Sequence, residues 1–200
     1  MILKKISEDL KKLTDYKNVW IQVIDTKGRS LYRSWTDKKG DSLYEIRADL
    51  RELISTRQLK SSISVGIFSM TFKSMVPIFD GNQFIGVIEI ITHFNSISKK
   101  LALDKLDSIV LADKKFEKQL THNITKQFID GYYLANLENS PEYVSFLKRV
   151  GINNILEIND YKIIDDILVT YEKVKGVDGE TLGYFVLFKK VADIEKADIQ

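Results

Sequence analysis

The 200-residue sequence predicts an α+β fold, in which antiparallel sheets are flanked by helices. In the first half, a helical pattern is followed by two strand-like segments, a second helical pattern and three more strand-like segments, an order typical of this fold class. The turn dipeptide Asp80-Gly81, followed by an apolar strand, has a counterpart in Asp178-Gly179. We interpret the repeat as two related domains with a boundary near Ser98 to Lys105; a chance match between two hairpins is the alternative.

The chain is expected to begin with an amphipathic helix over residues 2 to 13. Val19 to Ile24 and Arg29 to Trp35 are rich in aromatic and β-branched residues, so we expect two strands there. Asp25-Thr26-Lys27-Gly28 between them has the composition of a hairpin turn. The apolar positions of the helix are Ile2, Leu3, Ile6, Leu10 and Leu13.

A second helix is expected over Leu43 to Gln58, which contains neither proline nor glycine. Three strands follow, over Ser62 to Gly66, Phe68 to Phe79 and Phe84 to His93. The apolar stripe of the helix is formed by Ile46, Leu50, Leu53 and Ile54.

The second half is expected to contain strands at Ser108 to Ala112 and Ile155 to Ile158, and a closing hairpin of Val169 to Val174 with Leu182 to Phe188. A helix is expected over Pro141 to Val150, because proline is favoured at a first helical position. Residues 131 to 136 lie between the strand at Ser108 to Ala112 and the helix at Pro141 to Val150. They fit either a strand on the sheet or the end of a helix that begins near Ile124.

Composition excludes several classes of function. Thirty basic and 28 acidic residues are mixed along the chain, so no broad basic surface for nucleic acid is expected. There is no cysteine, which removes thiol catalysis, thiolate metal ligands and disulfides. His93 and His122 are the only histidines, and they lack the spacing of metal ligands. We therefore expect no enzyme activity, no metal site and no cofactor.

Five of the six arginines lie close together in the first half of the chain, near three aromatic residues. A guanidinium group binds a carboxylate or phosphate through two parallel hydrogen bonds, which an ammonium group cannot do. The cluster therefore indicates recognition of a small anion. The arginines are Arg29, Arg33, Arg47, Arg51 and Arg57, and the aromatic residues are Tyr32, Trp35 and Tyr44.

A ligand site is expected where this helix covers the sheet. Arg33 and Trp35 share one face of a predicted strand, while Tyr44, Arg47 and Arg51 form one stripe of the predicted helix. The alternatives are that Arg47 and Arg51 lie on a solvated helix face, and that Trp35 belongs to the core.

Lys73 and Glu89 are charged residues within apolar strands, and Lys73 directly follows Phe72. A charge buried without a partner costs several kcal/mol, so each of the two reaches solvent, pairs with another charge or faces a ligand cavity. In the third case, Phe72, Lys73 and Glu89 belong to the ligand site.

Four segments resemble the double Cache sensor domains of bacterial chemoreceptors, sensor histidine kinases and diguanylate cyclases. They are residues 20 to 28, 31 to 35, 40 to 43 and, above all, 75 to 89, with the sequence Met-Val-Pro-Ile-Phe-Asp-Gly-Asn-Gln-Phe-Ile-Gly-Val-Ile-Glu. The resemblance implies an N-terminal helix followed by two PAS-like domains, each an antiparallel sheet flanked by helices. One branch of the family binds amino acids through an Arg-x-Trp-Tyr element, but Thr36 follows Trp35 here, so those roles are not carried to this chain.

The resemblance also implies an organisation and a location. Residues 1 to 17 would be the last turns of a longer helix, residues 18 to 100 the membrane-distal domain and residues 101 to 195 the membrane-proximal one. Such a region lies in the periplasm between two transmembrane helices of its receptor, senses a small molecule for chemotaxis or two-component signalling, and can form a homodimer through the N-terminal helix. We expect the distal domain to bind a small carboxylate or other anion. The alternative function is a cytoplasmic tandem of PAS- or GAF-like domains that binds a partner protein or nucleotide.

Overall fold

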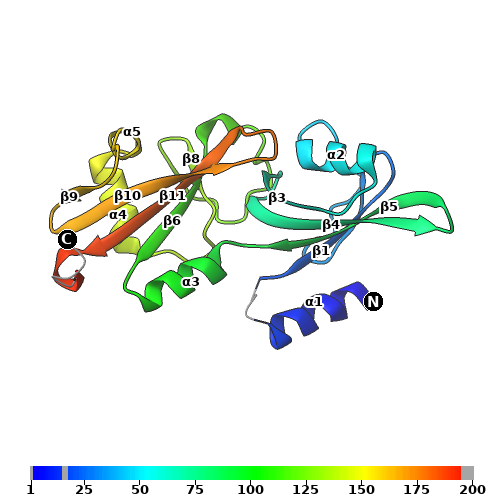
Figure 1. Ribbon diagram of the computed structural model, residues 1–200, viewed down its shortest axis with the longest axis horizontal. Coiled ribbons are helices and arrows are strands. Elements are labelled where there is room, and N and C mark those ends of the chain that lie inside the picture. The colour runs from blue at the N-terminus through cyan, green and yellow to red at the C-terminus, as the bar shows by residue number, and fades with distance from the viewer. Residues whose placement is uncertain (1, 15–17, 195–200) are drawn as a thin grey trace. The chain divides into compact units, whose positions relative to one another are not determined.

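The structure is a computed structural model that describes residues 2–14 and 18–194 (Figure 1). The chain divides into two compact units. The first unit consists of Met1–His93 with Lys175–Glu180, and the second of Phe94–Val174 with Thr181–Gln200. The predicted helix tail and second domain extend to residues 1, 15 to 17 and 195, which lie outside the described residues.

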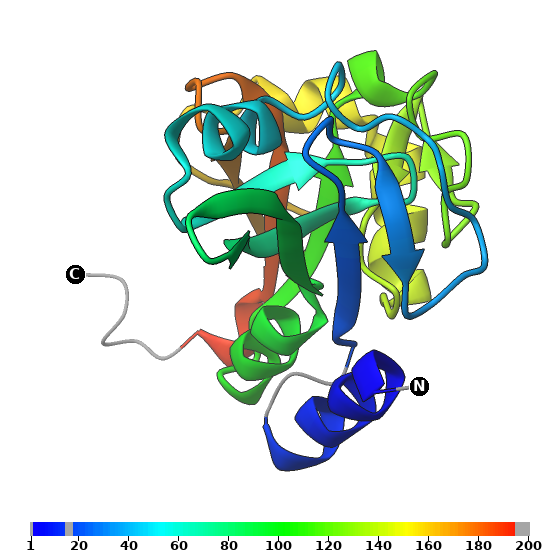
Figure 2. The same cartoon turned by 90° about the vertical axis from the view of Figure 1, so that its right-hand side faces the viewer.

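The first unit contains a five-stranded antiparallel sheet with the strand order β2-β1-β5-β4-β3. Helices α1 and α2 lie on opposite sides of this sheet (Figures 1 and 2). In chain order the elements are α1 (Ile2–Leu13), β1 (Trp20–Ile24), β2 (Ser30–Arg33), α2 (Ala48–Thr56), β3 (Lys60–Val65), β4 (Met70–Asp80) and β5 (Gln83–Thr92).

Most boundaries in this unit agree with the sequence pattern, but α2 begins later than predicted. Leu43 donates its backbone N–H to the carbonyl oxygen of Gly28 at 2.8 Å, which ties this part of the chain to the β1–β2 turn. Helical geometry therefore starts only at Ala48. The helix ends at Thr56, and the next residue, Arg57, caps it with a left-handed φ of 60°.

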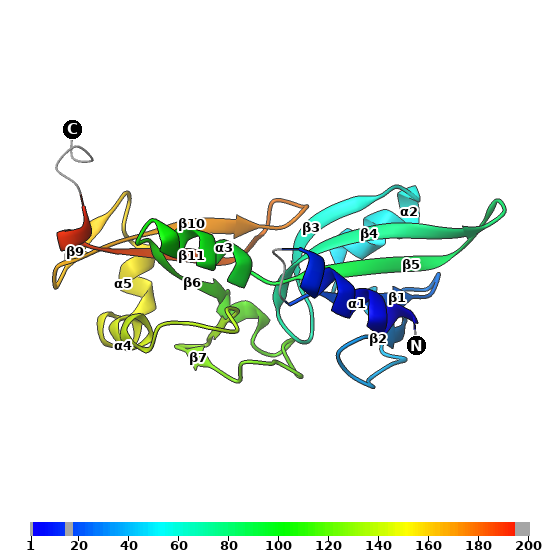
Figure 3. The same ribbon diagram turned by 90° about the horizontal axis from the view of Figure 1, so that it is seen from below.

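The second unit is built on a six-stranded sheet with the order β7-β8-β6-β11-β10-β9 (Figure 3). Each strand pair whose register the structure describes is antiparallel. The elements are α3 (Asn95–Leu103), β6 (Asp107–Ala112), β7 (Phe128–Ile129), β8 (Tyr132–Leu134), α4 (Pro141–Val150), α5 (Ile152–Leu156), β9 (Lys162–Ile164), β10 (Ile167–Lys175) and β11 (Thr181–Lys190), with short 3₁₀ helices at Lys114–Phe116 and Val191–Asp193.

The predicted fold class, an N-terminal helix and two antiparallel sheets with flanking helices, is confirmed. Helix α4 has the predicted bounds, and of the two alternatives for residues 131 to 136 the structure contains the strand β8. The predicted strand at Ile155 to Ile158 is wrong. Ile152 and Ile155, three residues apart on α5, are both fully buried, so this short apolar run belongs to a helix and not to a strand.

The core of the second unit fills the space between α4 and its sheet. Tyr143 of α4 stacks on Phe188 of β11 with ring centroids 4.5 Å apart, and Phe146 meets the same ring edge-on at 5.8 Å. Leu147 and Ile152 are completely buried in the same cluster. Apolar packing thus accounts for this side of the second sheet.

Two glycines allow close strand packing at corresponding places in the two units. A Cβ atom on Gly86 of β5 would lie 2.5 Å from the carbonyl oxygen of Ile24, at the end of β1. A Cβ on Gly183 of β11 would overlap the carbonyl oxygen of Leu111 on β6. Gly86 lies in the apolar strand after the Asp80-Gly81 turn, and Gly183 lies in the strand after Asp178-Gly179. The repeat therefore has a packing reason in each sheet.

We expect Gly183→Ala to lower the free energy of unfolding by about 1–3 kcal/mol, the usual cost of an extra methyl group in a filled space. Urea unfolding followed by circular dichroism measures the change. Gly66→Ala is the control, because its Cβ would have only the carbonyl oxygen of Ser69 within 4 Å, at 3.9 Å. Equal stability of the two variants would contradict the packing role of Gly183.

Candidate functional site

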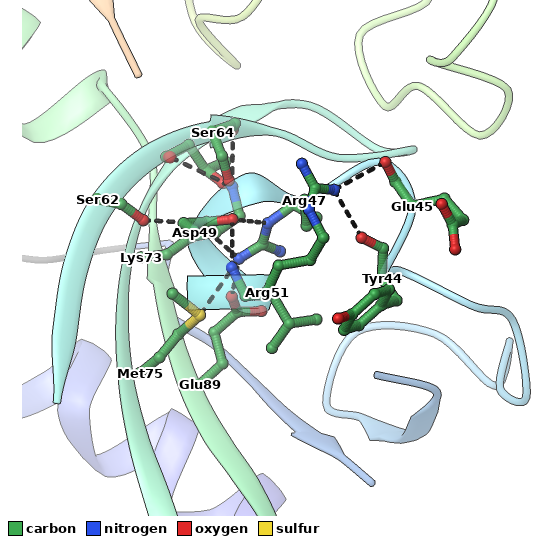
Figure 4. Close-up of polar contacts among 12 residues, drawn as sticks. Tyr44, Glu45, Arg47, Asp49, Arg51, Ser62, Ser64, Lys73, Met75 and Glu89 are labelled. Carbon is green, nitrogen blue, oxygen red and sulfur yellow. Dashed lines mark hydrogen bonds and ion pairs between the residues drawn. The ribbon is translucent and has the colours of Figure 1, made fainter. Parts of the chain in front are cut away.

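A buried cluster of charged side chains lies between α2 and the first sheet (Figure 4). Arg47, just before α2, donates from Nε to Oδ1 of Asp49 at 2.7 Å and from Nη2 to Oδ2 at 2.9 Å. The same Nη2 donates to Oε1 of Glu89 on β5 at 2.6 Å. Since these three side chains are at most 2% exposed, the ion pairs link the start of α2 to the middle of the sheet.

Asp49 connects the cluster to α2 and to β3. Its Oδ1 accepts the backbone N–H of Leu50 at 2.9 Å, and its Oδ2 accepts the hydroxyl of Ser62 at 2.6 Å. Burial alone would raise the pKa of Asp49, but the charge and hydrogen bonds of Arg47 hold it well below its usual range. The carboxylate is therefore ionised throughout the physiological pH range.

Lys73 of β4 completes the cluster. Its Nζ donates to the carbonyl oxygen of Ser64 at 2.7 Å, to Oγ1 of Thr71 at 2.7 Å and to the carbonyl oxygen of Thr71 at 3.3 Å. Burial, together with the charge of Arg47, lowers the pKa of Lys73 to about 7. Lys73 is thus a buried amine that can change its charge near neutral pH.

A second ion pair lies at the end of β2. Arg33 donates to both carboxylate oxygens of Asp41, at 2.6 and 2.8 Å, and to the carbonyl oxygen of Lys38 at 2.9 Å. The hydrogen bond from Arg33 lowers the pKa of Asp41. The guanidinium carbon of Arg33 lies 5.2 Å from the ring centroid of Phe68, within the range of a cation–π contact.

Aromatic side chains form the wall beside these charges. Trp35 stacks on Trp20 of β1 with centroids 4.4 Å apart, and Phe68 meets Trp35 edge-on at 5.5 Å. His93 lies edge-on to Trp20 and donates from Nδ1 to the carbonyl oxygen of Asn18 at 2.9 Å. Because burial lowers the pKa of His93 to about 4, the ring is neutral at pH 7 and adds no charge to the site.

A cavity of about 30 Å³, here called the inner cavity, lies among these groups. Three basic residues, Arg33, Arg47 and Lys73, line it. The carboxylates that pair with the two arginines, on Asp41, Asp49 and Glu89, do not. The other lining residues are Trp20, Gln22, Trp35, Leu43, Gly66, Ile67, Phe68, Ser69, Thr71 and Ile91.

Three buried N–H donors of the lining residues have no acceptor among the described residues. They are Nε2 of Gln22, Nε of Arg33 and Nε1 of Trp35. Buried donors are nearly always hydrogen-bonded in proteins, and each unsatisfied one costs about 1–3 kcal/mol. An acceptor oxygen in the inner cavity would satisfy such donors, which gives the cavity the chemistry of a site for a small anion.

The structure brings together five of the eight residues predicted to bind ligand. Arg33, Trp35, Arg47 and Lys73 line the inner cavity, and Glu89 holds Arg47. Phe72 does not join them, because it lines a hollow on the other face of the sheet.

The predicted helical stripe of Tyr44, Arg47 and Arg51 is wrong, because α2 starts at Ala48 and only Arg51 is part of it. Arg51 donates to the carbonyl oxygens of Tyr44 and Glu45, at 2.8 and 2.9 Å, in exposed hydrogen bonds (Figure 4). The predicted strand at Arg29 to Trp35 also ends early, at Arg33, so Trp35 reaches the cavity from a bend.

The sequence reasoning missed Gln22, Asp41 and Asp49. Gln22 could have been found, because it is a polar residue within the apolar strand at Val19 to Ile24. Asp49 could also have been found, because it directly precedes Leu50 of the predicted apolar stripe. Asp41 had none, since an acid in a loop with lysines is ordinarily solvated.

The hollow on the other face of the first sheet is larger, about 720 Å³. None of its lining residues carries a buried polar side-chain atom that lacks a partner in the described structure. The unsatisfied donors therefore distinguish the inner cavity from this hollow, despite the smaller volume of the inner cavity.

No group of three or more histidine, aspartate or glutamate side chains in residues 2–14 and 18–194 is arranged to hold a metal ion. No helix in the same ranges is long and apolar enough to cross a membrane.

No protein-family model and no curated protein matches the sequence. Among solved structures, the chain is similar to the sensor domain of the V. cholerae histidine kinase DctB, at 12% identity and a TM-score of 0.46, over 94% of this chain and 78% of that one. It is also similar to the ligand-binding domain of the Pseudomonas aeruginosa PAO1 amino acid chemoreceptor PctB in complex with L-Gln, at 14% identity and a TM-score of 0.40, over 90% and 73%.

A third similar structure is an extracellular ligand binding receptor from Desulfohalobium retbaense DSM5692, at 12% identity and a TM-score of 0.44. The similarity covers 92% of this chain but only 32% of that receptor. Sensor domains of histidine kinases and ligand-binding domains of chemoreceptors are two of the protein classes that the sequence resemblance named.

We expect Glu89→Gln to lower the free energy of unfolding by about 3 kcal/mol, because it removes one carboxylate from a buried ion-pair network. Glu52→Gln is the matched control. Glu52 pairs with Lys60 at the surface, where an ion pair contributes at most about 1 kcal/mol. Urea unfolding of the three proteins measures both effects, and a loss for Glu89→Gln no larger than for Glu52→Gln would contradict the network's role.

We also expect stability to rise with pH because of Lys73. Its pKa is about 7 in the folded chain but about 10.5 in the unfolded chain. Between these values the unfolded state binds more protons than the folded state, so the free energy of unfolding increases with pH. Below pH 7 the lysine is charged in both states, so the full cost of burying its charge lowers the free energy of unfolding.

Urea unfolding at pH 6.5 and pH 9 tests this effect of Lys73. Lys73→Met removes the titrating amine but keeps the apolar stem, so the gain in stability between the two pH values should shrink. The same gain in both proteins would assign the pH dependence to other groups.

Proposed function

We propose that this chain is the extracytoplasmic sensing region of a bacterial membrane receptor and that its first unit binds a small carboxylate or similar anion in the inner cavity. The observation that carries the proposal is the set of three buried N–H donors, on Gln22, Arg33 and Trp35, that lack acceptors among the described residues. The sequence resemblance to double Cache domains supports the sensing role.

The charge distribution favours an anion over a cation. Arg33, Arg47 and Lys73 line the cavity, while Asp41, Asp49 and Glu89 bind the arginines from outside it. An anion in the cavity therefore meets cationic groups and N–H donors first. Because the arginines are already oriented by these carboxylates, little side-chain entropy is lost when the ligand binds.

Ligand entry requires the site to open, since about 30 Å³ accommodates only one or two water molecules. The β3–β4 turn is the segment suited to this movement. Its residues Gly66, Ile67, Phe68 and Ser69 line the cavity, and the turn is closed by a backbone hydrogen bond from Gly66 to Ser69 of 3.0 Å. Moving Phe68 away from Trp35 would enlarge the cavity next to the free donors.

Signalling then follows as a population shift between a closed, empty state and an expanded, occupied one. The ligand would connect the sheet residue Gln22 with Arg47 at the start of α2, and so favour one arrangement of helix on sheet. We propose that the second unit relays this difference to a transmembrane helix of the parent receptor.

A thermal-shift experiment tests the binding site. The chain is heated with the sodium salts of formate, acetate, lactate, pyruvate, succinate and glycine, each compared with sodium chloride at equal ionic strength. A ligand present at a hundred times its dissociation constant should add about 2.7 kcal/mol to the free energy of unfolding. We expect a rise in melting temperature with at least one carboxylate and none with chloride.

Two variants locate the binding. Trp35→Phe keeps an aromatic ring but removes one free donor, so it should weaken binding of the active carboxylate by about tenfold, the value of one hydrogen bond to a charged group. Arg51→Ala is the control, because Arg51 is outside the cavity and its loss should leave the shift unchanged. No shift with any carboxylate, or the same shift in Trp35→Phe, would overturn the proposal.

A further inference from the structure

The larger hollow lies on the opposite face of the first sheet from the buried charges, on the side of α1. Here it is called the outer hollow; Ile63 of β3, Phe72 of β4 and Ile90 of β5 line it, together with Leu10 of α1 and Val19. Its volume of about 720 Å³ is within the range of about 300–1,000 Å³ that is usual for small-molecule sites. The outer hollow is thus large enough for a ligand without any opening movement.

The chemistry of the outer hollow differs from that of the inner cavity. Strands β3, β4 and β5 contribute the hydroxyl groups of Ser61, Ser74 and Thr92 to the outer hollow. Ser62 of β3 also lines the hollow, but its hydroxyl donates to Asp49 in the buried cluster. No aspartate or glutamate is among the lining residues, and the charged ones are two lysines, Lys73 and Lys175.

Only one of these lysines presents its charge to the outer hollow. The Nζ of Lys73 binds Ser64 and Thr71 within the buried cluster. Lys175 is exposed and has no ion pair in the described part of the chain. A ligand in the outer hollow therefore meets an extensive apolar wall and a single positive charge.

We propose that the outer hollow binds a medium-chain carboxylic acid, with its alkyl chain against Ile63, Phe72 and Ile90 and its carboxylate at Lys175. An alkyl chain of this length removes apolar surface from water along β3, β4 and β5, and each buried methylene group tightens binding by about fourfold. The single carboxylate of such an acid would pair with the single exposed lysine of the outer hollow, Lys175. The outer hollow is separate from the inner cavity, because alternate residues of a strand point to opposite faces of the sheet. Phe72 lines the outer hollow, whereas the amine of the next residue, Lys73, lies on the side of the inner cavity.

Calorimetric titration of the whole chain with sodium octanoate tests the proposal, with 1-octanol as the neutral probe of equal chain length. We expect saturable octanoate binding that is about two- to fivefold tighter than octanol binding, because an ion pair with an exposed lysine contributes at most about 1 kcal/mol, or about fivefold in affinity. Octanol binding as tight as octanoate, or no saturable octanoate binding, would overturn the carboxylate assignment.

Charge-reversal variants test whether octanoate binds at Lys175. Lys175→Glu should weaken octanoate binding by about tenfold or more, whereas Lys173→Glu, an exposed lysine two residues earlier on β10 that does not line the hollow, should leave it unchanged. Ser74→Phe fills the hollow and should abolish binding, with circular dichroism to confirm that the variant is folded. Equal octanoate affinity in Lys175→Glu and Lys173→Glu would overturn the proposal even if Ser74→Phe fails to fold.

Discussion

The first unit depends on the buried ion pairs of Arg47 with Asp49 and Glu89. Through these contacts a single guanidinium group fixes the start of α2 to β5, and Asp49 extends the connection to Ser62 of β3. An uncompensated charge at this depth would cost several kcal/mol. The helix can therefore cover the sheet only in the arrangement that pairs all three groups, and this arrangement also sets the wall of the inner cavity.

The alternation of side chains along β4 and β5 gives the first sheet two chemically different faces. The face under α2 carries Lys73 and Glu89, whereas the face toward α1 carries Phe72 and Ile90. Buried polar groups on the first face demand hydrogen-bond partners, and apolar groups on the second gain from any surface that excludes water. In the second unit, α4 covers its sheet with apolar side chains that fill the space. This contrast is the physical basis for the proposal that the first unit binds a ligand.

Part of the candidate site was predictable, because a charge inside an apolar strand is rare enough to require an explanation. Lys73 and Glu89 were found in this way, and the concentration of arginine led to Arg33 and Arg47. Arg51 was misplaced together with Tyr44, since helical spacing alone does not reveal where a helix starts. The start of α2 depends on a backbone hydrogen bond from Leu43 to Gly28, which lies fifteen residues earlier in the chain, and periodicity contains no such information.

The α+β class, most strands and the helix Pro141–Val150 follow from the amino-acid pattern alone, because turn residues, proline position and the alternation of apolar residues act locally. The sequence also shows that the chain lacks thiol chemistry. Three features required the folded chain: the face that each charge occupies, the pairing of carboxylates with arginines, and the helix Ile152–Leu156. These outcomes depend on contacts between residues far apart in the chain, where the cost of burying a charge or an apolar side chain is set by the partner that folding brings to it.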